Sequence, residues 1–396
     1  MKWETTTVGR HCTVTSSKRF HLSDRSDSGI PFYCSKEIIQ KVKGEEVTDC
    51  DYIKEEAYEN VKKQFGVPEC GDLLITTRGT YGVPYIYKKT DKFYFADGNL
   101  TWLKDFDDSL FVEYLYYWVR SHEGQKKIDA IAKGTAQKAV PITLIKSLEI
   151  SLPPIETQFR IADILSSYDD LIENNRKQIK LLEEAAQRLY KEWFVDLRFP
   201  GYETAKIVDG VPDGWRPVPL SEIANVIMGQ SPKSEFYNNK KEGVPFHQGV
   251  GSYGARFVVD ETYSTSFTRI APAGSILFSV RAPVGRLNIT RNKVVIGRGL
   301  AAMNHKQNLQ SFLFYMLKER FFKDDLVGNG SIFASIAKNE LLSQKFIVPC
   351  VGLDVKFNNI IRQVDRKIES LDEQIHLLTE ARDRLLPKLM SGELEV

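Results

Sequence analysis

Cysteine is scarce in the 396-residue sequence, and no two cysteines have the spacing of a metal site. The sequence contains Cys12, Cys34, Cys50, Cys70 and Cys350, and none belongs to a C-x-x-C motif. An odd number of widely spaced cysteines favours a reducing compartment and argues against a zinc site or a disulfide framework. The six histidines are also scattered, so we expect no bound metal.

Long apolar runs are missing as well. The first ten residues, MKWETTTVGR, contain no apolar core, so no signal peptide is predicted. No stretch approaches the ~18 apolar residues of a membrane helix. We therefore expect a cytoplasmic protein without a membrane partner. The apolar content of 42% is ample for the two or three domains that this length suggests.

Motifs of catalysis are not found either. There is no G-x(4)-G-K-[ST] loop to hold ATP phosphates. The nearest approach to the N/D-P-P-Y/F motif of adenine methyltransferases is Leu152-Pro153-Pro154-Ile155. This segment lacks the polar residue for the target amine and the aromatic ring that stacks on a flipped base. A helix start explains it better, and we predict no catalytic residue, metal or cofactor in this chain.

Two segments carry the heptad pattern of a coiled coil. From 152 to 200, apolar side chains alternate by four and three residues, as at Ile161 and Leu165, and adding 196 to each number gives an equivalent seam. Since each seam needs a partner helix, we predict an intramolecular coiled coil of helices 158–194 and 354–390. The predicted seam residues are Ile172, Ile179, Leu182 and Leu189 in the first helix, and Ile368, Leu371, Ile375, Leu378 and Leu385 in the second.

The match between the two helices extends beyond the apolar positions. Identical polar residues recur at the 196-residue offset, as at Asp169 and Asp365. This disfavours two unrelated amphipathic surface helices, which would share only their apolar spacing. Asn175 lies at a seam position whose equivalent is Leu371, and a polar seam residue usually fixes the register at a cost in stability.

The globular segments that precede the helices repeat too. The sequence GDLLITTRGTYG at 71–82 matches GSILFSVRAPVG at 274–285, and an arginine follows the apolar run in both copies, at Arg78 and Arg281. Short β-branched and aromatic runs are separated by Gly-rich turns. This pattern predicts an α+β fold with a curled, mostly antiparallel sheet in each copy, so that the whole chain is pseudo-two-fold.

In their order, duplication and half-length spacing these motifs resemble the specificity (S) subunits of type I restriction–modification systems. The motifs are the repeated G-D/S-x-L-x(3)-R-x(3)-G block, the G-x-P-F-x block, and a strand-Pro-Pro exit into a helix that ends E-A-x-x-R-L. The resemblance implies a target-recognition domain at 1–151, a conserved long helix at 152–200, a linker and second target-recognition domain at 201–349, and a second conserved helix at 350–396.

The resemblance also implies ligand and partners. The helices would pair antiparallel, set the distance between the half-sites of a split double-stranded DNA target, and dock two adenine-methyltransferase (M) subunits. Motor-nuclease (R) subunits would join that core. The chain would be non-catalytic, with S-adenosylmethionine, ATP and Mg on the partner subunits.

Two other functions remain open at this point. One is a coiled-coil protein-interaction scaffold without DNA specificity, which would not show the salt-dependent duplex binding that counterion release demands of a DNA reader. The other is an enzyme in its own right, which the missing motifs disfavour.

Positive charge is concentrated in the second globular segment. Residues 217–349 hold 16 Lys+Arg against 9 Asp+Glu, net +7, whereas residues 1–151 hold 22 of each. Arginine suits phosphate and the O6/N7 edge of guanine, and glutamine suits adenine. The alternative for each candidate is a solvated surface charge, and for Arg78 and Arg281 an internal salt bridge. The candidate DNA-binding residues are Lys18, Arg19, Arg78, Thr80, Tyr81, Lys88, Gln137 and Lys138 in the first domain, and Gln248, Arg256, Arg281, Arg286, Arg291 and Arg298 in the second.

Overall fold

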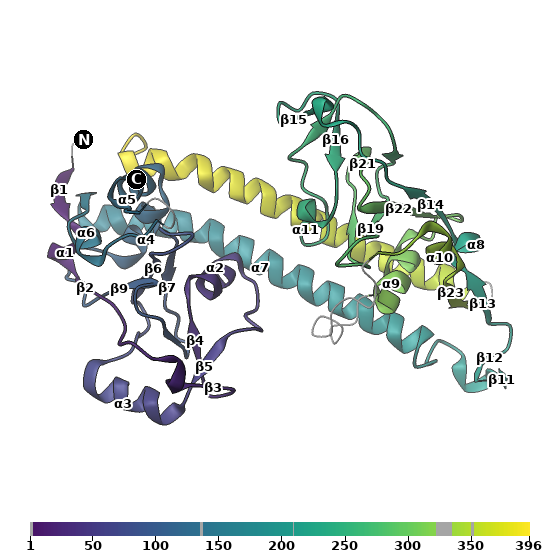
Figure 1. Ribbon diagram of the computed structural model, residues 1–396, viewed down its shortest axis with the longest axis horizontal. Helices are drawn as coiled ribbons and strands as arrows, with labels where there is room; N and C mark the ends of the chain where they lie inside the picture. The colour runs from purple at the N-terminus through teal and green to yellow at the C-terminus, as the bar shows by residue number, and fades with distance from the viewer. Residues whose placement is uncertain (1–2, 135–137, 209, 322–334, 350–351) are drawn as a thin grey trace. The chain divides into compact units, whose positions relative to one another are not determined.

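The computed structural model describes residues 3–134, 138–208, 210–321, 335–349 and 352–396 (Figure 1). The chain forms two compact units, one of Met1–Lys177 with Leu371–Val396 and the other of Gln178–Ser370. Each unit combines one globular α+β domain with parts of two long helices, α7 (Ile155–Phe194) and α11 (Leu353–Ser391). None of the helices in the described residues has the length and hydropathy needed to cross a lipid bilayer.

The globular domain of the first unit contains two four-stranded sheets. The first sheet has the order β2 (Thr13–Thr15), β9 (Leu100–Lys104), β6 (Leu73–Thr76) and β7 (Pro84–Ile86). The second has the order β3 (Arg25–Ser26), β5 (Asp51–Ile53), β4 (Ile30–Tyr33) and β8 (Tyr94–Phe95). A separate pair joins β1 (Glu4–Thr7) to β10 (Glu149–Leu152). The helices are α1 (Val8–His11), η1 (Leu22–Asp24), α2 (Ser35–Lys43), α3 (Glu55–Phe65), α4 (Val112–Arg120), α5 (His122–Ile131) and α6 (Ile142–Lys146).

The globular domain of the second unit follows the same plan. Its first sheet has the order β14 (Ala224–Met228), β22 (Leu300–His305), β19 (Ile276–Ser279) and β20 (Leu287–Ile289). Its second has the order β15 (Tyr237–Asn238), β17 (Tyr263–Ser264), β16 (Val244–His247), β21 (Val294–Ile296) and β18 (Ile270–Ala271). Two further pairs are β11 (Ile207–Val208) with β12 (Val211–Pro212), and β13 (Arg216–Pro219) with β23 (Lys345–Val348). The helices are η2 (Tyr202–Thr204), α8 (Leu220–Ile223), η3 (Ser234–Phe236), η4 (Val250–Ser252), α9 (Gln310–Phe321) and α10 (Lys338–Ser343).

The internal repeat predicted from the sequence is confirmed by the strand pairing. Strands β2-β9-β6-β7 correspond in order to β14-β22-β19-β20. Among the described strands of each copy, one pair is parallel, β4 with β8 in the first and β16 with β21 in the second, and the other pairs are antiparallel. The α+β class and the mostly antiparallel sheets are therefore as predicted.

Buried strands and an aromatic helix form the core of each unit. Leu73 and Ile75 of β6 pack in one cluster with Trp118 of α4, and Phe278 of β19 packs with Tyr315 of α9 in the equivalent place. All four residues of β6 and of β19 are buried. A strand buried on both faces reads as a continuous apolar run, which is why the sequence shows LLI and ILF there.

In the first unit, α7 and α11 run antiparallel. Ile161 of α7 shares a buried cluster with Leu389 of α11, whereas Asn175 Nδ2 donates to Gln374 Oε1 at 3.2 Å. Residue numbers thus fall along α11 as they rise along α7. Asn175 is only 6% exposed, and its bond to another amide explains how a polar residue is tolerated in the seam.

The second unit pairs the other halves of the same helices in the same sense. The ring centroids of Trp193 and Phe357 lie 6.0 Å apart, and Ala186 shares the buried cluster with Ile361. The antiparallel coiled coil is therefore as predicted.

The predicted seam residues fall into two groups by burial. Buried are Ile172, Ile179, Ile368 and Leu371. Half-buried are Leu182, Leu189, Ile375, Leu378 and Leu385. Because each compact unit takes part of both helices, the predicted boundaries at 151, 200 and 349 describe an order along the chain and stay a prediction as domain limits.

Candidate nucleic-acid interface

Three adjoining loops of the second unit present one amide and two guanidinium groups. Gln248 directly follows β16, Arg281 follows β19 by two residues, and Arg298 follows β21 by two residues. The Gly299 N–H donates to the Gln248 carbonyl at 3.2 Å, and the Val280 N–H donates to the Gly299 carbonyl at 2.9 Å. These bonds hold the loops side by side. We call the exposed side chains of Gln248, Arg281 and Arg298 the polar rim of the second unit.

Within this rim, the side chain of Gln248 is held by a serine. Ser231 Oγ donates to Gln248 Oε1 at 2.7 Å. Ser231 Oγ in turn accepts the backbone N–H of Arg298 at 3.2 Å. The side-chain amide of Gln248 is therefore fixed in one orientation by a chain of two hydrogen bonds.

An open cleft of about 830 Å³ lies against Gln248 and Arg298. Its lining includes Tyr237 and Phe246, whose rings stack with centroids 4.6 Å apart and planes 25° apart. A cleft that combines amide and guanidinium donors with an aromatic wall suits the edge of a nucleic-acid base.

The first unit builds an equivalent rim. Arg78 follows β6 by two residues and forms a β-bridge with Ala139, as Arg281 does with Ser335. Lys138, next to Ala139, is exposed, as are Arg78 and Thr80. The structure thus brings Arg78, Thr80 and Lys138 to one edge of the sheet. Gln137 lies outside the described residues.

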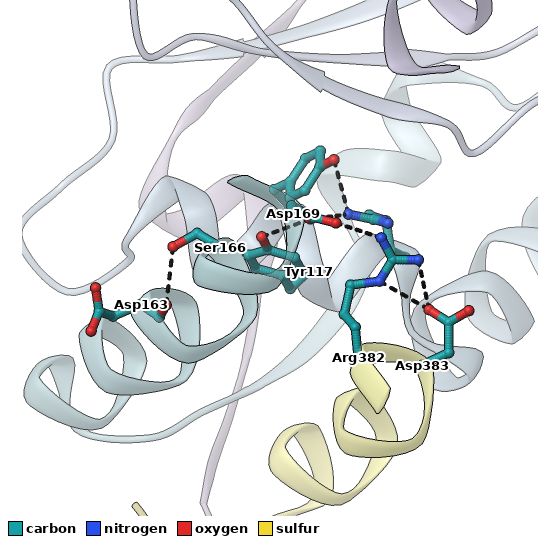
Figure 2. A network of polar contacts seen from close by, with 8 residues as sticks. Tyr117, Asp163, Ser166, Asp169, Arg382 and Asp383 are labelled. Atoms are coloured by element: carbon teal, nitrogen blue, oxygen red, sulfur yellow. Dashed lines mark hydrogen bonds and ion pairs between the residues drawn. The ribbon is translucent and has the colours of Figure 1, made fainter. Parts of the chain in front are cut away.

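Asp169 of α7 connects the first globular domain to both long helices, as Figure 2 shows. Its Oδ2 accepts from the Tyr117 hydroxyl at 2.9 Å and from Arg120 Nη1 at 2.8 Å, and its Oδ1 accepts from Arg382 of α11. Burial on its own would raise the pKa of Asp169, but Arg120 and Arg382 outweigh it and hold the pKa below its ordinary value. The carboxylate is therefore charged at neutral pH and anchors the domain on which the first rim stands.

Comparison with known proteins decides the family. The model of the type I restriction modification DNA specificity domain matches residues 1–184 and 212–380. The chain belongs to this family. A putative type I restriction enzyme MjaX specificity subunit of Methanocaldococcus jannaschii is 31% identical over 360 residues, which cover 89% of this chain and 84% of that protein. The HindI specificity subunit of Haemophilus influenzae is 26% identical over 359 residues, which cover 71% of this chain and 77% of that protein.

A solved structure shows the same fold. The S subunit of a type I restriction–modification system from M. genitalium matches with a TM-score of 0.59 and 17% identity, covering 98% of this chain and 96% of that one. As a member of the DNA specificity family, the chain is a DNA-recognition component rather than a catalytic one. In the described part of the chain, no group of three or more His, Cys, Asp or Glu residues could hold a metal ion.

Several first-domain candidates of this specificity chain are engaged in local contacts. Arg19 and Lys88 form ion pairs, Lys18 lies over an aromatic ring, and Tyr81 bonds to a carboxylate. The ion pairs and the ring contact leave the three basic side chains exposed. The contacts are Arg19 Nε to Asp97 Oδ2 at 2.9 Å, Lys88 to Glu173 at 3.4 Å, Lys18 to the Phe65 ring centroid at 4.1 Å, and Tyr81 to Asp129.

One candidate of the second domain needs correction. Arg256 is 3% exposed, and its guanidinium bonds to Glu183 at 3.1 Å and to Asp365 at 2.6 Å. It also lies 3.8 Å from the ring centroid of Phe314. The structure contradicts the prediction that Arg256 binds DNA, because the side chain is buried and its guanidinium joins the globular domain to α7 and α11.

Two other arginine candidates of the second domain do not line the cleft beside Gln248 and Arg298. Arg291 is half-buried, with its guanidinium 4.4 Å from the ring centroid of Phe257. Arg286 is half-buried, and its backbone N–H donates to Ser279 Oγ at 2.8 Å. Arg286 lines a separate pocket of about 400 Å³ together with Asn288.

Sequence reasoning missed Ser231 and Asp97. Ser231 is 17 residues from Gln248 and lies in no motif that repeats, so no local signal identifies it. Asp97 lies two residues after β8, as Arg298 lies two residues after β21. The alignment of β8 with β21 would have revealed that one rim has an acid where the other has an arginine.

Proposed function

We propose that this chain is the cytoplasmic DNA-reading subunit of a type I restriction–modification complex, in which each globular domain recognises one half of a split double-stranded DNA target. The observation that carries the proposal is the polar rim found at equivalent strand ends of two domains in a chain of the DNA specificity family. Base edges are read by hydrogen bonds, whereas phosphate contacts fix position, and the rims offer side chains for both.

The long helices support the docking of partner subunits. Phe159 and Leu181 of α7 are 46% and 64% exposed, and Val355 and Leu377 of α11, each 196 residues further on, are 41% and 55% exposed. Because these apolar side chains are exposed at equivalent positions, each long helix offers a partner the same pair of contacts. Two equivalent sets fit two methyltransferase (M) subunits. In this proposal the R subunits join that core, and S-adenosylmethionine, ATP and Mg are bound by the partners.

The hypothesis that each domain recognises its half-site independently is tested by replacing residues 217–349 with the corresponding segment of another specificity-family protein. We expect one half of the methylated motif to change and the other half to stay, because each domain has its own core and rim. The measurement is genome-wide mapping of methylated adenines in cells that carry the M subunits. The matched control replaces 1–151 instead and should change only the opposite half. A hybrid whose two half-sites change together would contradict the proposal.

The rim itself is tested by Arg281→Ala. A lost base contact should cost about 1–3 kcal/mol of binding and relax one position of the target, whereas a lost phosphate contact should weaken all sequences alike and reduce the salt dependence. The measurement is duplex binding at two salt concentrations. Arg216→Ala is the control, since Arg216 is an exposed arginine of the same unit on β13. Equal affinities for the two variants would mean that Arg281 does not contact DNA.

A further inference from the structure

Gln248 is an exposed side chain with an unusually restricted conformation. A glutamine on a surface samples several rotamers, and ordering it on binding costs up to about 2 kcal/mol of conformational entropy. In this chain the side chain is already ordered before any ligand binds, because Ser231 Oγ donates to Gln248 Oε1 at 2.7 Å. A preorganised polar side chain at the edge of a cleft is what recognition of a ligand edge requires.

The structure orients the amide with its oxygen toward Ser231. Ser231 has one hydroxyl proton, and its oxygen already accepts the N–H of Arg298 at 3.2 Å. The hydroxyl proton is thus available for Gln248, and the amide atom that faces it is the acceptor Oε1. The Nε2 group is left with its two N–H donors, and no acceptor in the described residues takes them. Gln248 therefore offers donors to the cleft that it lines.

Two glycines next to Gln248, Gly297 and Gly299, leave the space that this side-chain conformation requires. The Gly297 N–H donates to the carbonyl of His247 at 2.8 Å. A Cβ on Gly297 would collide with Oε1 of Gln248, and one on Gly299 would lie 2.6 Å from the Gln248 carbonyl oxygen. Because such distances do not occur for real Cβ atoms, both positions need glycine while Gln248 keeps this conformation.

The residue before Gln248 adds further rigidity. His247 is 0% exposed. Its two ring nitrogens lie within hydrogen-bond distance of Ser252 Oγ, at 2.9 Å, and Asp260 Oδ1, at 3.0 Å. The backbone that carries Gln248 is thus held by the buried His247 before it and by the hydrogen bonds from Gly297 and Gly299.

The first domain uses the same frame with different chemistry. Cys34 directly follows β4, as Gln248 follows β16, and its backbone N–H donates to Glu37 at the start of α2. Asp97 takes the place of Arg298 and pairs with Arg19. Two residues after the equivalent strand, one domain therefore has a guanidinium and the other has a carboxylate paired with an arginine. Two domains that read different half-sites would differ at the place where the bases are read.

We propose that Gln248, oriented by Ser231, is a specificity-determining residue of the second domain and reads a hydrogen-bond acceptor on the major-groove edge of one base. This rests on the proposed DNA-reading function. Guanine offers O6 and N7, adenine N7 and thymine O4, whereas cytosine offers only the N4 donor on that edge. The adjacent guanidinium of Arg298 is likewise a donor only. The contacted position of the half-site therefore excludes cytosine on the strand that Gln248 faces.

The test reverses the polarity of the side chain with Gln248→Glu, which keeps the shape and turns the outer donor into an acceptor. The probe is the chain assembled with its M subunits, bound to duplexes in which each position of the mapped target carries each of the four bases. We expect cytosine, which offers only a donor on that edge, to become preferred at one position, with relative affinities there altered about tenfold or more. All other positions should keep their preference.

Two further variants complete the design. Ser231→Ala leaves Gln248 in place but frees it, so the same base should remain preferred with weaker discrimination. Gln230→Glu adds the same charge at an exposed neighbouring residue and should weaken all duplexes alike. If Gln248→Glu behaves like Gln230→Glu, Gln248 contacts no base and the inference is overturned. Absence of any sequence preference in the unmodified complex would instead overturn the proposed DNA-reading function.

Discussion

Replacing Arg256 by alanine is expected to lower the free energy of unfolding of the second unit by about 3–5 kcal/mol, the usual cost of removing one partner of a buried charge cluster. The side chain is 2% exposed, and its guanidinium bonds to Glu183 of α7 and Asp365 of α11. Without it, two carboxylates remain close together with no cation between them. The stacking on Phe314 is lost as well.

The measurement is amide hydrogen exchange, which reports the two units separately. We expect faster exchange in β19, β22 and α9, and little change in β6 and β9 of the first unit. Arg269→Ala is the matched control, because Arg269 is an exposed arginine of the same domain and should change stability by no more than about 0.5 kcal/mol. Equal exchange in the two variants would show that the Arg256 cluster adds no net stability.

Asp169→Asn should have the second-largest effect on stability, and the unit that it destabilises is the first. The change keeps the shape of the side chain but leaves the guanidinium groups of Arg120 and Arg382 without a carboxylate between them (Figure 2). Because Asp169 is 26% exposed, the cost should be smaller, about 2–3 kcal/mol. Asp163→Asn is the control, since Asp163 is an exposed carboxylate on the same helix, and hydrogen exchange in α4 and β6 is the measurement.

The same variant has a pH signature. Asp169 has a lowered pKa in the folded chain, so its stabilising contribution is complete above the unfolded-state pKa of about 3.9. It is lost as the pH falls through the lower folded-state pKa. The unmodified first unit should therefore lose this stabilisation below about pH 4, whereas Asp169→Asn should lack that part of the pH dependence. Identical acid-unfolding curves would rule out a charged Asp169 as the anchor.

The two clusters show how far the repeat can be read from the sequence. Asp169 and Asp365 were visible as equivalent residues because their helices repeat at 196 residues. Their arginines were not: Arg382 has Ala186 as its equivalent on α7, and the second unit instead takes Arg256 from a loop. Both copies keep the aspartate on the long helix, but the arginine that pairs with it comes from a different part of the chain in each copy.

Contacts over long sequence separations account for the rest of what was missed. Periodicity identifies helices and buried strands because it reflects local geometry. Arg256, in contrast, was taken as a surface residue because its partners lie 73 and 109 residues away. Arg281 and Arg78 were identifiable because each follows a repeated strand, whereas Ser231 gains its role only when β16 pairs with β21.

The way the first unit is assembled has a consequence for its synthesis. This unit includes Leu371–Val396, whereas the second is the continuous segment Gln178–Ser370. Leu165 of α7 is buried in a cluster that also needs Leu389. At ~5–20 residues per second, the roughly 220 intervening residues take about 10–40 s to leave the ribosome. The second unit is itself being synthesised during that time, since its last residue is Ser370, and the nascent chain carries the open apolar seam of the first unit, which can bind a chaperone or the seam of a neighbouring nascent chain.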